Sequence, residues 1–585
     1  MAATASSTAG LAAPRRRLGL PLDRIAWLLL AAFVAVVVLV PLAYTVDAAF
    51  YAETRTGLST RRSLAAVTAV YTSWEYLSVL VNAIVLALVV TALSLVVGVA
   101  MALLVGRTDI PFKGVLDMLV ILPLFLSPFT GLIAWIALGS EKTGFVNGAV
   151  RAVLGTFMES PPALVNLWSY GGIVWVMFLF FCPFVYLFTL GSLRSMDASL
   201  EEAARTSGAS VLQTVMRVTL PMSLPSIFAA GLLVFILAAE MYTIPGIIGG
   251  TFGFVTLPWR IYQDSTVFPV HQAHAAASGT ILLWVTIGGV WMQRRMTRVS
   301  ERYVSISGKG FRGRPLALGR ARWLALAFVG LYVASADVLP FGALIVSSLM
   351  KFSAASLSAD VFTTKHYVEL FTLANMRDAL WNTALLAVLS GAICVAAGLV
   401  ISYAEVRRPG RATRLLAFVG VLPVAVPGLV YGIGLLWTYL HTPLYGTIWI
   451  LLLAYVAKFL PYGILVSRNG ILQVHPELEQ SARMSGATTR QALVHVTMPL
   501  LRVTLIAVLF FVMIMSIKEL SASILLYAQQ SQVLSVLTWH YMDSGNYQFA
   551  AAVGVVQTVL MILLVVGTRA VFRVRLESAI GKGGS

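Results

Sequence analysis

Long apolar segments, separated by short polar ones, recur along the whole chain. A helix needs about 20 mainly apolar residues to cross a bilayer, and each of these segments is close to that length or longer. The predicted spans of the first half are residues 25–46, 77–105, 115–138, 168–191, 223–247 and 272–292. Those of the second half are residues 322–349, 379–403, 414–440, 446–468, 501–527 and 549–572. The pattern predicts an all-α, polytopic membrane protein with about twelve transmembrane helices.

The composition supports a protein surrounded by lipid. Hydrophobic residues make up 59% of the 585 residues and charged residues only 11%, whereas a soluble globular protein has about 25% charged residues. A soluble fold of this size would need more polar surface than the chain offers. Cys182 and Cys394 both lie inside apolar runs and are expected to be packed as small hydrophobic residues.

The distribution of basic residues predicts the orientation. The net charge is +17, but the basic residues lie between apolar segments, which is typical of cytoplasmic loops and not of a nucleic-acid-binding protein. If the N-terminus is cytoplasmic, the inner segments carry 30 of the 41 Lys and Arg residues. Both termini are therefore expected in the cytoplasm.

The two halves of the chain repeat each other. Asn82, Gly98 and Pro123 recur as Asn382, Gly398 and Pro423, 300 residues later. Further on the offset falls to 278 residues, because the first half has a longer outer loop near residues 140–166. Each half holds six predicted spans, so the repeat is parallel. We expect domains at residues 1–300 and 301–585, joined by a basic linker at residues 293–320.

The strongest repeat lies between the fourth and fifth spans of each half, at residues 199–221 and 476–499. Across twenty aligned positions, from Glu202 to Pro221 and from Gln480 to Pro499, nine residues are identical without a gap. Unrelated segments would share one or two, so this is an internal repeat.

Local physical chemistry predicts two short helices with a sharp corner in each copy. Gly208 and Gly486 can adopt the left-handed conformation that ends a helix. Residues 210–213 and 488–491, which read Ser-x-x-Gln and Thr-x-x-Gln, then form capping boxes for a second helix. Pro221 and Pro499 are expected to break the chain before the next span.

This segment resembles the EAA loop of the permeases of ABC importers, in which Glu-Ala-Ala is followed by Gly and later by Leu-Pro. The first copy fits throughout, while the second has Gln480 and Ser481 in place of Glu and Ala, with Glu479 adjacent. In that family the loop docks on a cytoplasmic ATPase. The resemblance therefore implies coupling residues in both copies: Glu202, Ala203, Ala204, Gly208, Pro221, Glu479, Ala482, Gly486 and Pro499.

The resemblance covers nearly the whole chain and is greatest to fused permeases of the ferric-iron, thiamine and polyamine branch. It implies the type I ABC importer transmembrane fold in a bacterial inner membrane, two copies of an ATPase subunit and a periplasmic or lipid-anchored substrate-binding protein. Ferric iron is the first expectation for the solute. 2-Aminoethylphosphonate, thiamine and polyamines remain alternatives, because fold and coupling loop do not determine specificity.

Motifs of enzymes are missing from the sequence. A phosphate-binding loop needs Gly-Lys followed by Ser or Thr, but Gly308-Lys309 and Gly581-Lys582 are each followed by Gly. The chain is therefore expected to be a transport subunit without a cofactor, and the ATPase a separate chain. A secondary transporter of the major facilitator type also has twelve spans in two repeats, but it would not need an EAA loop.

Charged residues inside the apolar segments are costly and often functional. Glu240 lies in the fifth predicted span, Lys458 in the tenth, and Lys518 and Glu519 in the eleventh. Glu240, Lys518 and Glu519 are candidates for the translocation path, while an internal ion pair or a helix end are the alternatives.

Two histidines remain to be explained. His271 and His274 are three residues apart at the start of an outer helix, where they could share one face. Interfacial histidines are the more common case, and no metal-ligand motif accompanies them in the sequence, so no metal site is expected.

Overall fold

The computed structural model describes residues 21–54, 57–158, 163–196, 198–300, 316–354 and 358–572. Most of the linker, from 301 to 315, and both extreme termini lie outside these ranges. The described part is helical apart from one antiparallel hairpin, β1 (Tyr51–Thr54) and β2 (Gly57–Arg62). The predicted all-α class is confirmed.

The first half contains the elements up to α14, with short 3-10 or π turns labelled η. They are α1 (Pro21–Val34), η1 (Ala35–Leu39), α2 (Val40–Ala48), α3 (Ala65–Thr72), α4 (Trp74–Arg107), α5 (Lys113–Ile121), η2 (Leu122–Phe125), α6 (Pro128–Gly139), α7 (Phe145–Leu154), α8 (Tyr170–Ser195), α9 (Ala198–Thr206), α10 (Val211–Thr214), η3 (Val215–Thr219), α11 (Leu220–Ala239), α12 (Thr243–Gly250), α13 (Leu257–Thr266) and α14 (Gln272–Ser300).

The second half repeats this order. Its elements are η4 (Gly319–Ala321), α15 (Arg322–Val333), η5 (Ala334–Val338), α16 (Leu339–Ser348), η6 (Ala359–Val361), α17 (Lys365–Thr372), α18 (Ala374–Arg407), α19 (Arg411–Val421), η7 (Leu422–Ala425), α20 (Gly428–Tyr439), α21 (Ile448–Gln473), α22 (Pro476–Met484), α23 (Thr489–Ala492), η8 (Leu493–Thr497), α24 (Met498–Leu500), α25 (Arg502–Ile517), α26 (Ser523–Leu526), η9 (Gln529–Ser531), α27 (Leu534–Asp543) and α28 (Tyr547–Phe572).

Nine helical segments in the described ranges are long and apolar enough to cross a membrane, and three bent pairs bring the number to twelve. The predicted spans at 115–138 and 414–440 each consist of two helices, bent by 101° and 115° respectively. The chain is extended at Ser127 and at Pro427 before the next helix begins. Pro128 and Pro427, which lack an N–H group, favour these breaks.

Each half is built around its second span. α4 packs on α8 and α11, and α18 packs on α21 and α25. The glycines that repeat between the halves lie where these helices approach most closely. A Cβ atom on Gly98 would be 2.8 Å from the Cβ of Val185, and one on Gly398 would collide with the backbone of Gly463. Replacing either glycine would therefore force the helices apart.

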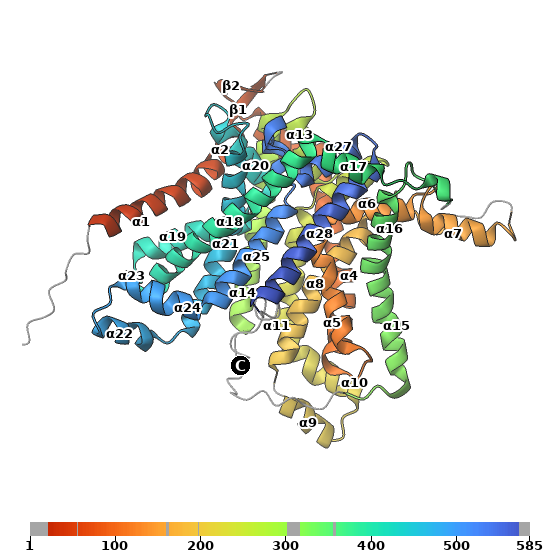
Figure 1. The fold of residues 1–585 in the computed structure, drawn as a ribbon, viewed down its shortest axis with the longest axis horizontal. Helices are drawn as coiled ribbons and strands as arrows, with labels where there is room; N and C mark the ends of the chain where they lie inside the picture. The colour runs from red at the N-terminus through yellow and green to blue at the C-terminus, as the bar shows by residue number, and fades with distance from the viewer. Residues whose placement is uncertain are drawn as a thin grey trace, which may run out of the picture.

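The first spans of the two halves are exchanged (Figure 1). η1 and α2 pack on α20 of the second half, where the Tyr431 hydroxyl donates to the Val37 carbonyl and Tyr439 donates to Val36 at 3.3 Å. In return α15 and α16 pack on α5 and α6 of the first half, and Tyr332 donates to the Leu179 carbonyl at 2.8 Å. The two halves therefore interlock.

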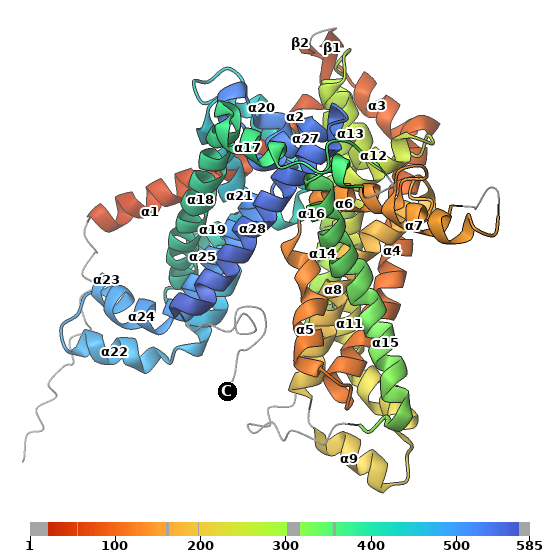
Figure 2. The same ribbon diagram turned by 45° about the vertical axis from the view of Figure 1, so that its right-hand side comes forward.

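The molecule has two different ends. The hairpin of β1 and β2 lies at one end, and α9 lies at the opposite end (Figures 1 and 2). α22 and α23 lie toward the end that carries α9. The two copies of the repeated loop are therefore presented on one side of the helical bundle.

Candidate functional site

Each copy of the repeated loop forms a sharp corner, here called an elbow, that is made of α9 with α10 in the first half and α22 with α23 in the second. Gly208 and Gly486 have φ angles of 88° and 92°. The amides of Gly208 and Ala209 bond back to Arg205 and Ala204, both at 3.0 Å, and the same pattern follows Gly486. This satisfies the last carbonyl groups of the helix. The predicted left-handed ends are confirmed.

The capping boxes are confirmed as well. The Ser210 amide donates to the Gln213 side chain at 2.9 Å, while the Gln213 amide donates to the Ser210 hydroxyl at 3.3 Å. Thr488 and Gln491 exchange the same bonds at 2.8 and 3.2 Å. The second short helix of each elbow therefore begins where the sequence predicts.

The predicted break at Pro221 is wrong. The chain is one helical segment from Val211 to Ala239, because the π turn η3 widens the helix just before the proline and accommodates its missing N–H group. In the second half a 77° bend does occur, between the segments Thr489–Leu500 and Arg502–Ile517, so the chain breaks shortly after Pro499.

A buried carboxylate anchors each elbow. Glu201 is 7% exposed and accepts a hydrogen bond of 2.8 Å from Thr219. Glu479 is 6% exposed and accepts one of 2.8 Å from Thr497. These residues occupy equivalent positions, 278 residues apart. Glu202, which the motif singled out, is exposed, so the structural counterpart of Glu479 is Glu201.

An arginine at the end of a long helix completes each anchor. Arg107, the last residue of α4, lies 3.4 Å from Glu201, and Arg407, the last of α18, lies 3.0 Å from Glu479. Motif reasoning missed both arginines and both threonines. The internal repeat carried the signal, since Arg107 and Arg407 are 300 residues apart and the threonines are identical in both copies.

The second anchor is tighter than the first. Tyr403 donates to Glu479 at 2.9 Å, and Arg407 also donates to the carbonyl groups of Val474 and Ile471 at 2.7 and 3.3 Å. The position equivalent to Tyr403 is Leu103, which cannot donate. Within the described residues the buried Nε and Nη2 atoms of Arg107 make no hydrogen bond.

The remaining predicted coupling residues form the outer surface of the elbows. The exposed ones are Glu202, Ala203, Gly208, Pro221, Gly486 and Pro499, while Ala204 and Ala482 are half-buried. Met484 is 89% exposed at the end of α22. Leu200, Leu212 and Leu478 are exposed on the elbow helices as well. An exposed surface of small residues and a few large apolar side chains is suited to close contact with another protein.

The charges predicted inside the membrane gather where the helices break. Glu240 directly follows α11, and Lys518 directly follows α25, so these two positions correspond and Glu519 lies one residue further on. The two alternatives, a helix end and an internal ion pair, both hold in part. Glu240 and Lys518 directly follow helix ends, and Lys458 pairs with Glu519 at 2.7 Å.

This charged cluster joins the two halves. Lys458 and Glu519 of the second half lie close enough to Glu240 of the first half to interact electrostatically. Lys518 donates a hydrogen bond of 2.9 Å to the carbonyl of Leu124, which belongs to η2 of the first half. The cluster therefore lies at the boundary between the halves.

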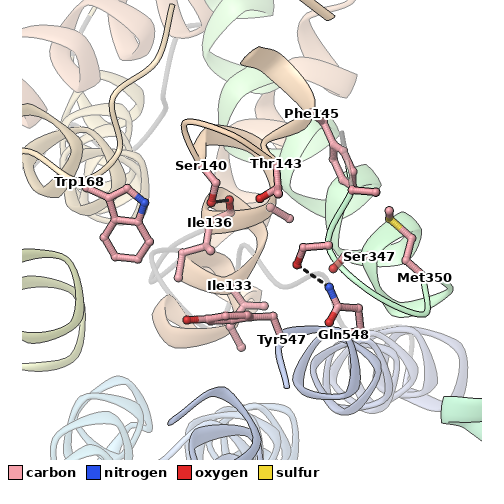
Figure 3. A pocket seen from close by; sticks show the side chains of 13 residues that line it. Ile133, Ile136, Ser140, Thr143, Phe145, Trp168, Ser347, Met350, Tyr547 and Gln548 are labelled. Carbon is pink, nitrogen blue, oxygen red and sulfur yellow. Dashed lines mark hydrogen bonds between the residues drawn. The ribbon is translucent and has the colours of Figure 1, made fainter. Parts of the chain in front are cut away.

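A pocket of about 530 Å³ of empty space also lies between the halves (Figure 3). It is lined by α6 and α7 on one side and by α16 and the start of α28 on the other. Gln548 donates to Ser353 there at 2.6 Å. The pocket shares no lining residue with the charged cluster and has no charged side chain in its described lining.

Comparison with known proteins agrees with this architecture. Residues 94–298 and 370–577 each match the family described as binding-protein-dependent transport system inner membrane component. The chain belongs to this family and is a fused permease of the ABC importer class, embedded in the inner membrane as a multi-pass protein. This membership rules out the major facilitator alternative.

Among its relatives is a ferric transport system permease protein FbpB of Actinobacillus pleuropneumoniae, 26% identical over 83% of this chain and 70% of that protein. A putative ferric transport system permease protein FbpB 1 of Haemophilus influenzae is 26% identical over 78% of this chain and 71% of its own length. A putative 2-aminoethylphosphonate transport system permease protein PhnU of Salmonella paratyphi A is 31% identical over 43% of this chain and 84% of its own.

Proposed function

We propose that this permease imports ferric iron that a soluble or lipid-anchored binding protein delivers, and that two copies of a cytoplasmic ATPase drive it. The observation that carries the proposal is the pair of elbows, each exposed on one face and anchored through a buried glutamate on the other. Residues 1–300 and 301–585 act as the two permease halves, and both termini are cytoplasmic. The ATP is hydrolysed on the partner chains.

The first elbow is mechanically connected to the charged cluster. The segment from Val211 to Ala239 is 29 residues long and spans about 43 Å at 1.5 Å per residue. The elbow lies at its start and Glu240 directly follows its end. Because Glu201 is also paired with Arg107, a displacement of α9 pulls on α4 as well as α11.

The second elbow is also connected to the cluster, but across the 77° bend that precedes α25. Glu479 is paired with Arg407 of α18, and the break after α25 holds Lys518 and Glu519. When two ATPase subunits close on ATP, they draw the two elbows together. The bundles then tilt about the charged cluster, and the solute site opens to one side and closes to the other. The permease contributes a two-state element that ligands on both sides bias.

The relatives support iron as the solute. The two ferric permeases align with more than three quarters of this chain, at 83% and 78%, whereas PhnU aligns with 43%. Uptake of radioactive ferric iron, 2-aminoethylphosphonate, thiamine and a polyamine, each with its cognate binding protein, tests the assignment. Uptake of another of these solutes without iron uptake would overturn it.

The coupling assignment is tested with Gly208→Val and Gly486→Val. A β-branched residue is strained at these positive φ angles, so each elbow changes shape. We expect weaker co-purification of the ATPase and at least tenfold slower uptake. Gly330→Val is the matched control, because a Cβ atom there meets nothing within 4 Å. Normal ATPase association and uptake in both elbow variants would refute docking at the elbows.

A further inference from the structure

Three potential metal ligands meet at the end of the molecule that carries the hairpin. Glu53 lies in β1, His271 directly precedes α14, and His274 lies in the first turn of α14. Glu53 is more than 200 residues from both histidines in the sequence, so only the fold brings them together. All three side chains are partly exposed, with 16%, 47% and 24% of the side chain accessible for Glu53, His271 and His274.

The ligand atoms have the spacing of a metal coordination sphere. Nδ1 of His271 and Nδ1 of His274 each lie 3.0 Å from the same oxygen, Oε2 of Glu53. The potential ligand atoms of all three residues lie within 4.8 Å of one another. Ligands at 2.0–2.2 Å from a tetrahedral zinc ion are about 3.3 Å apart. A small adjustment of the side chains is therefore enough to place an ion between them.

Hydrogen bonding among the three residues does not use all of their ligand atoms. His271 Nδ1 pairs with Glu53 Oε2, and the His274 amide donates to Glu53 Oε1 at 3.0 Å. His274 Nδ1 is buried and, within the described part of the chain, makes no hydrogen bond of acceptable geometry. This nitrogen is therefore not committed to a hydrogen bond and is available to a cation.

Neighbouring residues hold the two histidines in place. The His271 amide donates to the Asp264 carbonyl at 2.8 Å, and the Tyr76 hydroxyl donates to the Asp264 carboxylate at 3.0 Å. The ring of Tyr76 stacks on that of His274, with centroids 5.9 Å apart. Asp264 is itself fixed by Arg260 at 2.9 Å. Metal ligands usually have such an outer layer of oriented partners.

We propose that Glu53, His271 and His274 form a site for a divalent first-row transition-metal ion of the zinc class, at the end of the molecule opposite the elbows. Two imidazoles and one carboxylate suit such an ion. Three protein ligands leave a fourth position open to water or to a group from a docked protein. The ion fastens the hairpin to α14. This site goes beyond the proposed iron transport and is separate from the charged cluster.

The test uses the full-length protein, purified in detergent without a histidine tag and stripped with a chelator. After Zn²⁺ is added back, we expect one Zn²⁺ per chain by elemental analysis. When Co²⁺ is added in place of Zn²⁺, we expect a visible absorption band typical of four-coordinate Co²⁺. Loss of an outer partner of a metal ligand costs roughly 10- to 100-fold in affinity. Glu53→Gln, His271→Asn and His274→Asn each remove a ligand itself and should weaken binding by more than that factor.

His441→Asn is the matched control, since His441 is an exposed histidine outside the cluster, and it should bind Zn²⁺ like the wild type. Gel filtration and thermal unfolding show whether each variant is folded. The proposal would be overturned if the wild type did not bind Zn²⁺. It would also be overturned if a folded Glu53→Gln variant bound Zn²⁺ with the same affinity as the wild type. Because no transport is measured, this result is independent of the solute and of the ATPase.

Discussion

Thr497 Oγ1 donates a hydrogen bond of 2.8 Å to Glu479 Oε1, and both residues are buried beneath the exposed surface of the second elbow. The first elbow has the same bond, at the same length, between Thr219 and Glu201. The two copies differ at eleven of twenty aligned positions, so this bond is retained although the surface above it has changed. The two elbows are therefore anchored by the same hydrogen bond but expose different side chains.

Replacing Glu479 should destabilise the protein strongly. In Glu479→Ala the partly buried Arg407 loses its partner, which costs about 3–5 kcal/mol when one member of a buried pair is removed. The exposed neighbour Gln480→Ala is the matched control and should change stability by less than about 0.5 kcal/mol. Thermal unfolding in detergent measures both. Equal melting temperatures for the two variants would contradict the anchoring role of Glu479.

The difference between the two anchors gives a second prediction. Tyr403→Phe removes a hydrogen bond to a charged group, worth about 1.5–3 kcal/mol. Amide hydrogen exchange should therefore become faster in α22 and remain unchanged in α9, because the anchor of α9 has Leu103 of α4 at the position equivalent to Tyr403. Tyr445→Phe, at an exposed tyrosine, serves as the control. Unaltered exchange in α22 would show that the Tyr403 bond does not hold the elbow.

Lys458 and Glu519 should depend on each other. Lys458→Met leaves a buried carboxylate without its partner, which costs about 3–5 kcal/mol, whereas replacing both members of such a pair is often nearly neutral. The double variant Lys458→Met/Glu519→Met should therefore be more stable than Lys458→Met alone. A double-mutant cycle with thermal unfolding measures the coupling. Additive effects would mean that the pair is not coupled.

Glu240 offers a test of the translocation path. Glu240→Gln keeps the shape of the side chain and removes one charge from the cluster that joins the halves. We expect uptake to fall at least tenfold in Glu240→Gln and in Glu519→Gln while ATPase association is retained. Uptake of labelled solute into reconstituted vesicles is the measurement. Unchanged uptake in both variants would place these residues outside the path.

The exchange of first spans can be tested at Gly434. A Cβ atom on Gly434 would collide with the Pro41 carbonyl and the Thr45 hydroxyl, so Gly434→Val should push α2 away from α20. Overpacking of this kind typically costs about 1–3 kcal/mol. Gly342→Val is the control, because a Cβ atom there has no neighbour within 4 Å. A cysteine pair across this contact should cross-link less in Gly434→Val, and undiminished cross-linking would contradict the packing.

The sequence predicted those features that short segments determine. The spans follow from apolar length, and the corners at Gly208 and Gly486 follow from glycine, serine and glutamine chemistry within a few residues. The bends within 115–138 and 414–440 were missed although Pro128 and Pro427 mark them, because apolarity alone does not distinguish one straight helix from two bent ones. The continuous helix through Pro221 depends on a π turn that the residue pattern does not predict.

Contacts between distant segments could not be predicted. Glu201 and Glu202 are adjacent and chemically identical, but only Glu201 pairs with Arg107. The position of α9 relative to α4 decides which of the two does so. The meeting of Glu53 with His271 and His274 depends in the same way on the position of the hairpin over α14. The pairing of Lys458 with Glu519 requires α21 and the end of α25 to lie side by side.

The interlocking of the halves has a consequence for how the protein is made. The Val37 carbonyl accepts a hydrogen bond from Tyr431, which lies 394 residues later in the chain. The N-terminal helix therefore enters the membrane long before the surface it will cover has been synthesised. Until then only elements of the first half, such as α14, can cover this helix, so its docking on α20 waits until most of the chain has been translated.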